Sequence, residues 1–246
     1  MARSSIYRVF FASLATAALQ LLCFYLSCSG ILLNRGAHIE DAFSASLFSL
    51  LFAVGLFAVT FFLCRTGWET SSKTGYTLKR LSISEKQVYL WQTVYNTLAY
   101  LLYWLSQVLV IFALAAWYTA TQESGSQTEF MLFFRSAFVR GCWPMEDTIG
   151  FVRNVLFCVM LGITSARYPM AQRQGKRFGE IIPAYLAVVA LWNRWLGSGG
   201  MEDFLALIAI FALSVYSLSK LLKKEEVQDL YEEYCPRPPS SLRLPR

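Results

Sequence analysis

The sequence predicts an all-α protein, a polytopic transmembrane helical bundle of about six spans with both termini in the cytoplasm. Three observations lead to this fold class. Of the 246 residues, 56% are hydrophobic and 15% are charged, whereas an average soluble domain is about 45–50% apolar and 25% charged. The apolar residues form unbroken blocks of about 18 or more, the length that spans hydrocarbon. Alternating strand patterns are absent, which disfavours a transmembrane barrel.

Six apolar blocks are the expected spans, because only a helix satisfies its own backbone hydrogen bonds inside lipid. They cover residues 9–33, 42–64, 88–118, 149–166, 181–196 and 204–222. The first exceeds the apolar core of a signal peptide, about 7–15 residues, so we expect it to be retained. The third, at about 31 residues, exceeds the roughly 20 needed to cross, so it must tilt or project from the membrane. The fifth is the weakest, with Pro183 near one end and Arg194 near the other.

A short apolar segment at residues 130–139 separates the third and fourth spans. Its phenylalanines have the spacing of one helix face: Phe130, Phe133, Phe134 and Phe138. About ten residues cannot cross a bilayer. The pattern therefore predicts an outer-surface or re-entrant helix, flanked by Arg135 and Arg140.

The distribution of basic residues predicts the orientation of the bundle. The six-span arrangement places only five of the 22 lysines and arginines on the side away from the amino terminus, namely Arg35, Arg135, Arg140, Arg153 and Arg194. The other 17 share the side of the amino terminus. Because cytoplasmic loops carry the excess of lysine and arginine, both termini are expected in the cytoplasm.

The domain organisation follows from the same blocks. Residues 1–222 are expected to form one transmembrane domain, and residues 223–246 a cytoplasmic tail that is partly disordered, because it is charged and then proline-rich. Cysteines lie in or beside apolar blocks without a paired C-x-x-C spacing, at Cys23, Cys28, Cys64 and Cys158. We interpret them as small packing residues.

Catalysis on this chain is not expected. His38 is the only histidine, which removes every mechanism that needs two, and phosphate-loop, H-E-x-x-H and G-x-S-x-G motifs are absent. The chain is therefore expected to carry neither a metal nor another cofactor. The net charge of +6 sits almost entirely in loops, so it indicates membrane topology and lipid contact, not nucleic-acid binding.

The loop between the second and third spans, residues 65–86, is the most informative stretch. It is basic, and Tyr76, Leu78 and Leu81 give a short helix an apolar side. Ser82 with Glu85, and Ser84 with Gln87, have capping-box spacing, which would restart a helix into the third span. An alternative explanation is that the basic residues only hold topology and attract anionic lipid, at about 1 kcal/mol each.

This loop resembles the coupling helix in the permease subunits of type-two ABC exporters. The family pattern is a glycine, a basic helix with leucine, then proline and serine, and it is matched here by Gly75, Thr77, Leu78, Arg80, Leu81, Ile83 and Ser84. Ser82 stands where proline is common. The family's membrane-dipping segment also lies between the last two spans, whereas the extra segment here follows the third.

The resemblance implies a transport function and a set of partners. A separate ATP-binding cassette ATPase subunit would carry ATP and Mg²⁺, and the chain would pair with a second permease copy or a related permease. The residues implied to contact the ATPase are Gly75, Tyr76, Leu78, Lys79, Arg80, Leu81, Ser84 and Glu85.

Polar residues inside the expected spans are the other candidates. Arg153 would cost roughly 2.5–3.5 kcal/mol at mid-helix. Pairing with Glu146 or Asp147 is one interpretation, and a charge lining a translocation path, together with Asn96, is the other. Buried amides are expected to join helices, at about 0.6 kcal/mol each; they are Gln92, Asn96, Gln107 and Asn154.

The resemblance thus implies the membrane-spanning permease subunit of an ABC transporter, expected to be an exporter, in the cytoplasmic membrane. The alternative is a membrane scaffold or assembly protein, which needs helices and loops but no transport path. A membrane-embedded enzyme is a third class, and it would have to turn over substrate without a partner.

Overall fold

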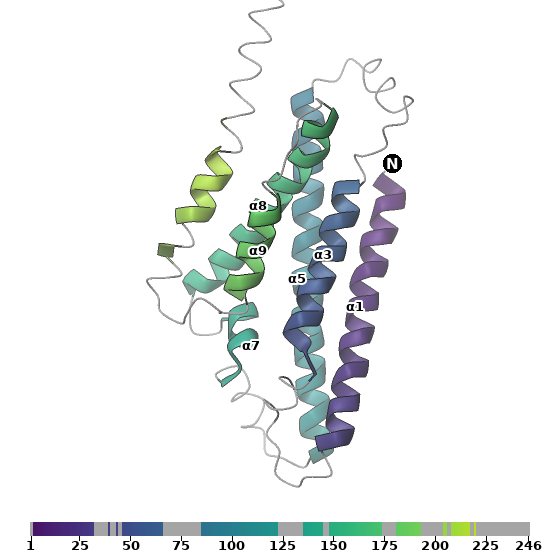
Figure 1. Cartoon of the computed structure of the whole chain (residues 1–246). Helices are drawn as coiled ribbons and strands as arrows, with labels where there is room; N and C mark the ends of the chain where they lie inside the picture. Colours follow the sequence, from purple (N-terminus) through teal and green to yellow (C-terminus); the bar gives the residue numbers. More distant parts are fainter. Residues whose placement is uncertain are drawn as a thin grey trace, which may run out of the picture.

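A computed structural model gives the fold of the chain (Figure 1). The residues that the structure describes are 2–31, 39, 43, 46–65, 85–122, 135–144, 148–173, 181–192, 204–205, 208–216 and 219. The named helices are α1 (Ala2–Ile31), α3 (Phe48–Arg65), α5 (Glu85–Gln122), α7 (Ala137–Cys142), α8 (Thr148–Arg173) and α9 (Ile181–Trp192). Residues 208–216 are also helical, and no strand occurs in these ranges. The all-α class is confirmed.

Four helices are long and apolar enough to cross a membrane. These candidate spans are Ile6–Ser29, Phe48–Arg65, Gln87–Thr121 and Thr148–Pro169. They overlap the first four spans expected from the sequence, with some differences at their ends. The structure therefore supports a membrane protein that crosses the bilayer several times.

The fifth and sixth expected spans are not among these four. α9 is apolar but has only 12 residues, fewer than the roughly 20 that cross hydrocarbon. In the range 204–222, the described positions 204–205, 208–216 and 219 are helical. A count of six spans stays a prediction.

The second span starts later than its apolar run. The sequence places its start at Ala42, whereas α3 begins at Phe48. Leu47 has a φ of 52°, which lies in the left-handed region and cannot continue a right-handed helix. The carbonyl of Leu47 nevertheless accepts the first helical hydrogen bond, from the amide of Leu51 at 3.0 Å.

α5 is the central helix of the bundle, and its neighbours lie on both sides of it (Figure 1). Its 38 residues give a length of about 57 Å, well beyond the roughly 30 Å of the hydrocarbon core. α1 runs parallel to α5, since Gln20 meets Gln107 and Phe24 meets Tyr118. α3 and α8 run antiparallel to it, so α1 and α5 begin at the end of the bundle where α3 and α8 terminate.

α5 and α8 pack closely because a glycine faces the contact. A Cβ atom added at Gly162 would lie 2.9 Å from the backbone nitrogen of Thr97 and 3.0 Å from its Cα. Such a small residue lets two backbones approach, which is a common basis of helix association in lipid. The α5–α8 contact is thus set by Gly162.

The short helix differs from the expected helix over residues 130–139. α7 begins at Ala137, because Ser136 has extended backbone and its hydroxyl accepts a hydrogen bond from the amide of Val139. The expected helix is therefore not continuous through Ser136, and Phe130, Phe133 and Phe134 lie outside the described residues. α7 packs on α5 and α9, with Val139 and Cys142 fully buried.

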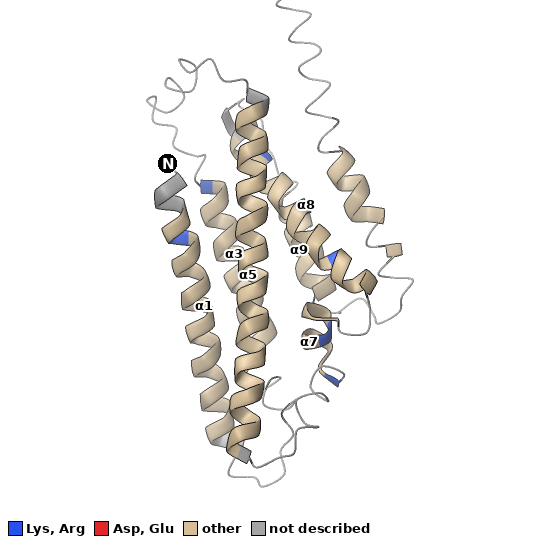
Figure 2. Ribbon diagram, turned by 180° about the vertical axis from the view of Figure 1, so that it is seen from behind, with Lys and Arg blue, Asp and Glu red and all other residues tan. Residues whose placement is uncertain are grey.

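Basic residues lie toward both ends of the bundle (Figure 2). Arg8 lies near the start of α1, Arg65 is the last residue of α3, and Arg167 lies in the last two turns of α8. Antiparallel packing brings these three helix ends to the same end of the bundle. Arg153 belongs to the opposite half of α8, and Arg140 belongs to α7.

Candidate functional site

A buried polar cluster lies where α8 meets α7 and α9, and its centre is Asn154. The Nδ2 atom of Asn154 donates hydrogen bonds to the carbonyls of Gly141 at 2.9 Å and Cys142 at 3.1 Å. Its Oδ1 atom accepts a hydrogen bond from Nε1 of Trp192 at 2.9 Å. One side chain therefore joins three helices.

Arg153 lies beside Asn154 and is only 1% exposed. Its Nη2 atom donates to Oδ1 of Asn154 at 3.2 Å and to the carbonyl of Gly141 at 3.3 Å. The guanidinium also lies 5.8 Å from the ring centroid of Phe157, within the range of a cation–π contact. These oxygens and this ring replace part of the water that the buried charge has lost.

The cluster supplies donors to the carboxyl end of α7. Gly141 and Cys142 are the last residues of α7, and the final carbonyls of a helix have no partner within that helix. Trp104 of α5 adds a third donor, since its Nε1 atom bonds the carbonyl of Cys142 at 3.0 Å. A positive charge is also favourable at a helix carboxyl end because of the helix dipole. Arg153, Asn154 and Trp104 therefore hold α7 in place.

Aromatic rings surround this anchor. Trp104 lies 5.5 Å from Phe151 and 6.2 Å from Trp143, measured between ring centroids. On the other side, Trp192 lies 5.1 Å from Phe52 and packs edge-on. The rings exclude lipid and water from the polar cluster, which strengthens its hydrogen bonds.

A second set of polar contacts joins α5 to its neighbours, outside the cluster. Each is buried and involves one side chain of α5: Asn96 Nδ2 to Ser165 Oγ at 2.9 Å, Tyr100 OH to Thr60 Oγ1 at 3.1 Å, Tyr103 OH to the Phe52 carbonyl at 2.8 Å, and Gln20 Nε2 to Gln107 Oε1 at 2.6 Å. The partners belong to α8, α3, α3 and α1 in that order. Buried amides thus join helices at three of the four expected positions, Asn96, Gln107 and Asn154.

The residues expected to line one path do not form one site. Asn96 bonds Ser165, which is 12 positions after Arg153 on α8, a separation of about 18 Å along the helix. Glu146 and Asp147 lie outside the described residues. The structure therefore places Asn96 and Arg153 in different regions of the α5–α8 interface.

The expected ATPase-contacting residues lie outside the described part of the chain, except for Glu85. Residues 66–84 connect α3 to α5, and Glu85 is the first residue of α5. The loop therefore joins two helices at the end of the bundle that carries Arg8 and Arg65.

Several anchoring residues had not been singled out from the sequence. Trp104 and Trp192 lie inside apolar blocks, and a buried tryptophan requires an acceptor for its N–H group. Gln20 is a polar residue in the middle of the first block, which was a usable signal. Nothing in the sequence indicated that the carbonyls of Gly141 and Cys142 would be acceptors, because every residue has a backbone carbonyl.

The chemistry of the cluster is that of a fixed structural joint. Its groups are amides, indoles, a guanidinium and backbone carbonyls, which bond strongly but supply no nucleophile. Among the residues that the structure describes, no group of three histidine, cysteine or acidic side chains is placed to hold a metal ion. Cysteines in that part of the chain are free, at Cys23, Cys28, Cys64, Cys142 and Cys158.

Long apolar helices with a buried polar interior define the class: an α-helical membrane protein that crosses the bilayer several times. No protein-family model, curated protein or solved structure matches the chain. Its function is therefore argued from its own residues.

Proposed function

We propose that this chain is the membrane-spanning permease subunit of an ABC transporter, expected to work as an exporter. A separate ATPase subunit would bind ATP and Mg²⁺. The observation that carries the proposal is the basic segment from Gly75 to Glu85, which is similar to the coupling helix of type-two ABC exporters and leads directly into α5.

The geometry of α5 suits such coupling. The segment is followed without interruption by a helix of 38 residues, which is stiff enough to carry a displacement along its length. Side chains of α5 bond α1, α3 and α8. A movement imposed on the segment by an ATPase would therefore reach several helices at once, as alternating access requires.

The topology in this proposal is six spans with both termini in the cytoplasm. The segment and the loop after α8 then face the ATPase, and a second permease copy or a related permease completes the transporter. Arg153 and Asn96 are buried by protein and hydrogen-bonded, which favours helix pairing over lining a path for both.

Co-purification with mass spectrometry tests the proposal. The tagged full chain is expressed in its own host and extracted in mild detergent, and an ATP-binding cassette ATPase is expected to co-elute. A triple variant, Leu78→Ala, Arg80→Ala and Leu81→Ala, should lower ATPase recovery at least tenfold.

The matched control changes a second basic loop at the same end of the bundle. The variant Arg173→Ala, Lys176→Ala and Arg177→Ala removes three charges there and should leave ATPase recovery unchanged. Equal losses in the two variants would contradict docking at Leu78–Leu81. Recovery of other membrane proteins without any such ATPase would favour a scaffold or assembly role instead.

Accessibility of single cysteines tests the topology. Introduced cysteines at Lys73 and Lys176, in a chain with its own cysteines replaced by serine or alanine, should resist a membrane-impermeant maleimide in intact cells. Labelling from outside would show that these loops face the exterior. That result would contradict both the expected orientation and the proposed ATPase contact.

A further inference from the structure

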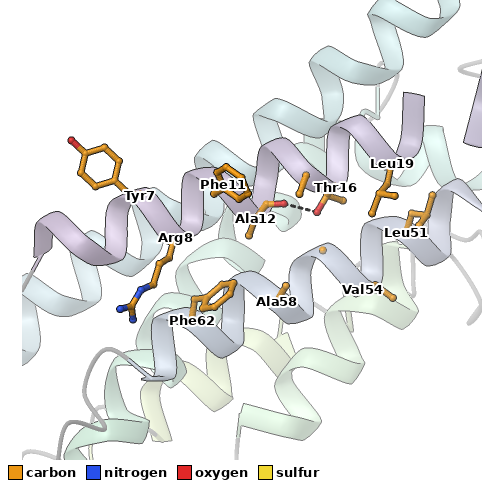
Figure 3. Close-up of a pocket in the computed structure, with 12 residues that line it drawn as sticks. Tyr7, Arg8, Phe11, Ala12, Thr16, Leu19, Leu51, Val54, Ala58 and Phe62 are labelled. Carbon is orange, nitrogen blue, oxygen red and sulfur yellow. Dashed lines mark hydrogen bonds between the residues drawn. The ribbon is translucent and has the colours of Figure 1, made fainter. Parts of the chain in front are cut away.

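α1 and α3 enclose an open groove of about 600 Å³ (Figure 3). Small residues keep the two helices from filling it, with Ala12 and Ala15 on α1 and Gly55 and Ala58 on α3. At the Gly55 level the groove has a closed floor, since a Cβ added there would lie 2.5 Å from Thr16 and from the Tyr103 hydroxyl. Packed atoms of Thr16 and Tyr103 therefore form the floor of the groove.

The interior of the groove offers an occupant no polar partner. Thr16 is the only hydroxyl between the ends of the lining, and its Oγ1 atom donates to the carbonyl of Ala12 at 2.7 Å. Figure 3 shows this bond and shows the Tyr7 ring turned away from α3. Apart from Arg8 at one end, the other lining side chains are apolar, and Leu19 and Leu51 are among them. An occupant must therefore be hydrocarbon over most of its length.

The dimensions of the groove select a slender occupant. Along α1 it extends from Arg8 to Leu19, about 17 Å at the helical rise, which is close to half of the roughly 30 Å hydrocarbon core. A helix of about 11 Å diameter over that length fills about 1,600 Å³, so at most its side chains could enter the groove. An acyl chain of one leaflet is slender enough to lie inside it.

The groove ends at a positive charge. Arg8 closes one end, and its guanidinium points from α1 toward the side of Phe62 (Figure 3). Arg8 is exposed, and no ion pair is made by it within the described ranges. Arg65 lies at the same end of the bundle but does not line the groove. A phosphate at the end of an acyl chain would meet Arg8.

We propose that this groove binds one anionic phospholipid, with an acyl chain between α1 and α3 and the phosphate at Arg8. A cation near an anionic lipid contributes about 1 kcal/mol, which corresponds to about a fivefold preference over a zwitterionic lipid. The site needs no ATPase, so it stands apart from the proposed transport function.

Native mass spectrometry of the full chain tests the site. The protein is reconstituted in vesicles of equal parts dioleoylphosphatidylglycerol and dioleoylphosphatidylcholine, then re-extracted in detergent. One retained phospholipid per chain is expected, with phosphatidylglycerol favoured about fivefold.

Two matched pairs of variants separate the groove from ordinary lipid contact. Ala58→Phe fills the groove and should abolish retention, whereas Ala18→Phe, on the exposed face of α1 outside the lining, should not. Arg8→Gln should bring the preference close to one, whereas Arg65→Gln should leave it at fivefold.

Two results would contradict the proposed lipid site. Retention that survives Ala58→Phe means that lipid binds elsewhere, and equal effects of Arg8→Gln and Arg65→Gln mean that the headgroup does not sit at Arg8. Val54→Phe fills the same groove and replaces Ala58→Phe if circular dichroism shows that the latter has lost its helices.

Discussion

The α5–α8 pair and the α1–α3 pair differ in how completely their side chains are buried. In the apolar window of α8, 67% of the residues are buried, against 22% in that of α1. Asn96 and Ser165 bond α5 to α8, and Gly162 brings their backbones together. α1 and α3 also approach closely where Gly55 meets Thr16, but beside that contact they leave an open groove of about 600 Å³.

The difference shows what holds helices together in lipid. Apolar contact gives little net gain there, because lipid tails are as apolar as leucine. Close backbones and polar bonds decide which helices associate, and α5 has both. α1 is joined to α5 by the amides of Gln20 and Gln107, and its Thr16 lies against Gly55 of α3. Most of the other side chains in its apolar window are exposed, so they can contact lipid.

The largest expected effect is at Gly162. Gly162→Val should destabilise the fold by about 3 kcal/mol, because the added carbons overlap the backbone of Thr97 and overpacking costs about 1–3 kcal/mol or more. Thermal unfolding in detergent measures it. Ala18→Val, which adds two methyl carbons on the exposed face of α1, should change little. Similar melting temperatures for the two variants would contradict the close α5–α8 contact.

The next effect is at the polar cluster. Asn154→Leu should cost about 2 kcal/mol, since it leaves Nε1 of Trp192 without its acceptor and removes an acceptor from the buried Arg153, and an unpaired buried polar group costs about 1–3 kcal/mol. Gln92→Leu on half-buried α5 surface is the control and should have a small effect. Thermal unfolding in detergent measures both variants. If Asn154→Leu lost no more stability than Gln92→Leu, that result would contradict the anchoring of α7 by Asn154.

Adding the same methyl groups to alanines in the two regions sharpens the comparison. Ala99→Val, at a core position of α5 that is 7% exposed, should cost about 1 kcal/mol through overpacking. Ala58→Val points into the groove, so its effect should stay within about 0.5 kcal/mol. Equal costs at the two sites would mean that the α1–α3 groove is as tightly packed as the core.

The smallest effect is expected where α1 meets α5. Gln20→Leu should destabilise by only a few tenths of a kcal/mol, since a hydrogen bond between helices in lipid contributes about 0.6 kcal/mol. The double variant Gln20→Leu, Gln107→Leu should restore stability because both polar groups are removed. A double-mutant cycle should give a coupling of about 0.6 kcal/mol. A coupling of zero would mean that the observed 2.6 Å bond does not fix α1.

The sequence predicted the helices more accurately than their contacts. The apolar runs at 9–33, 88–118 and 149–166 correspond to α1, α5 and α8, because lipid forces any long apolar segment to bond its own backbone. The start of α3 was misplaced, since the left-handed backbone at Leu47 has no marker in an apolar run. The break at Ser136, where α7 is capped, was likewise not expected from the spacing of the phenylalanines.

The site was less accessible to sequence reasoning. A buried asparagine or arginine predicts that a partner exists, and Asn154 and Arg153 do have them. The partners are the carbonyls of Gly141 and Cys142, which come from a six-residue helix with no distinguishing side chain. The sequence pattern could not identify these carbonyls as the partners, because a carbonyl becomes a partner only through its position in space.

Composition and spacing alone determined that this chain forms apolar helices long enough to cross a bilayer, since hydrocarbon leaves a long apolar segment no other way to satisfy its backbone. The tertiary structure decided which helices pack tightly and which leave a groove. That choice depends on where Gly162, Asn154 and Gln20 meet their partners, and such meetings are set by three-dimensional packing between distant parts of the chain.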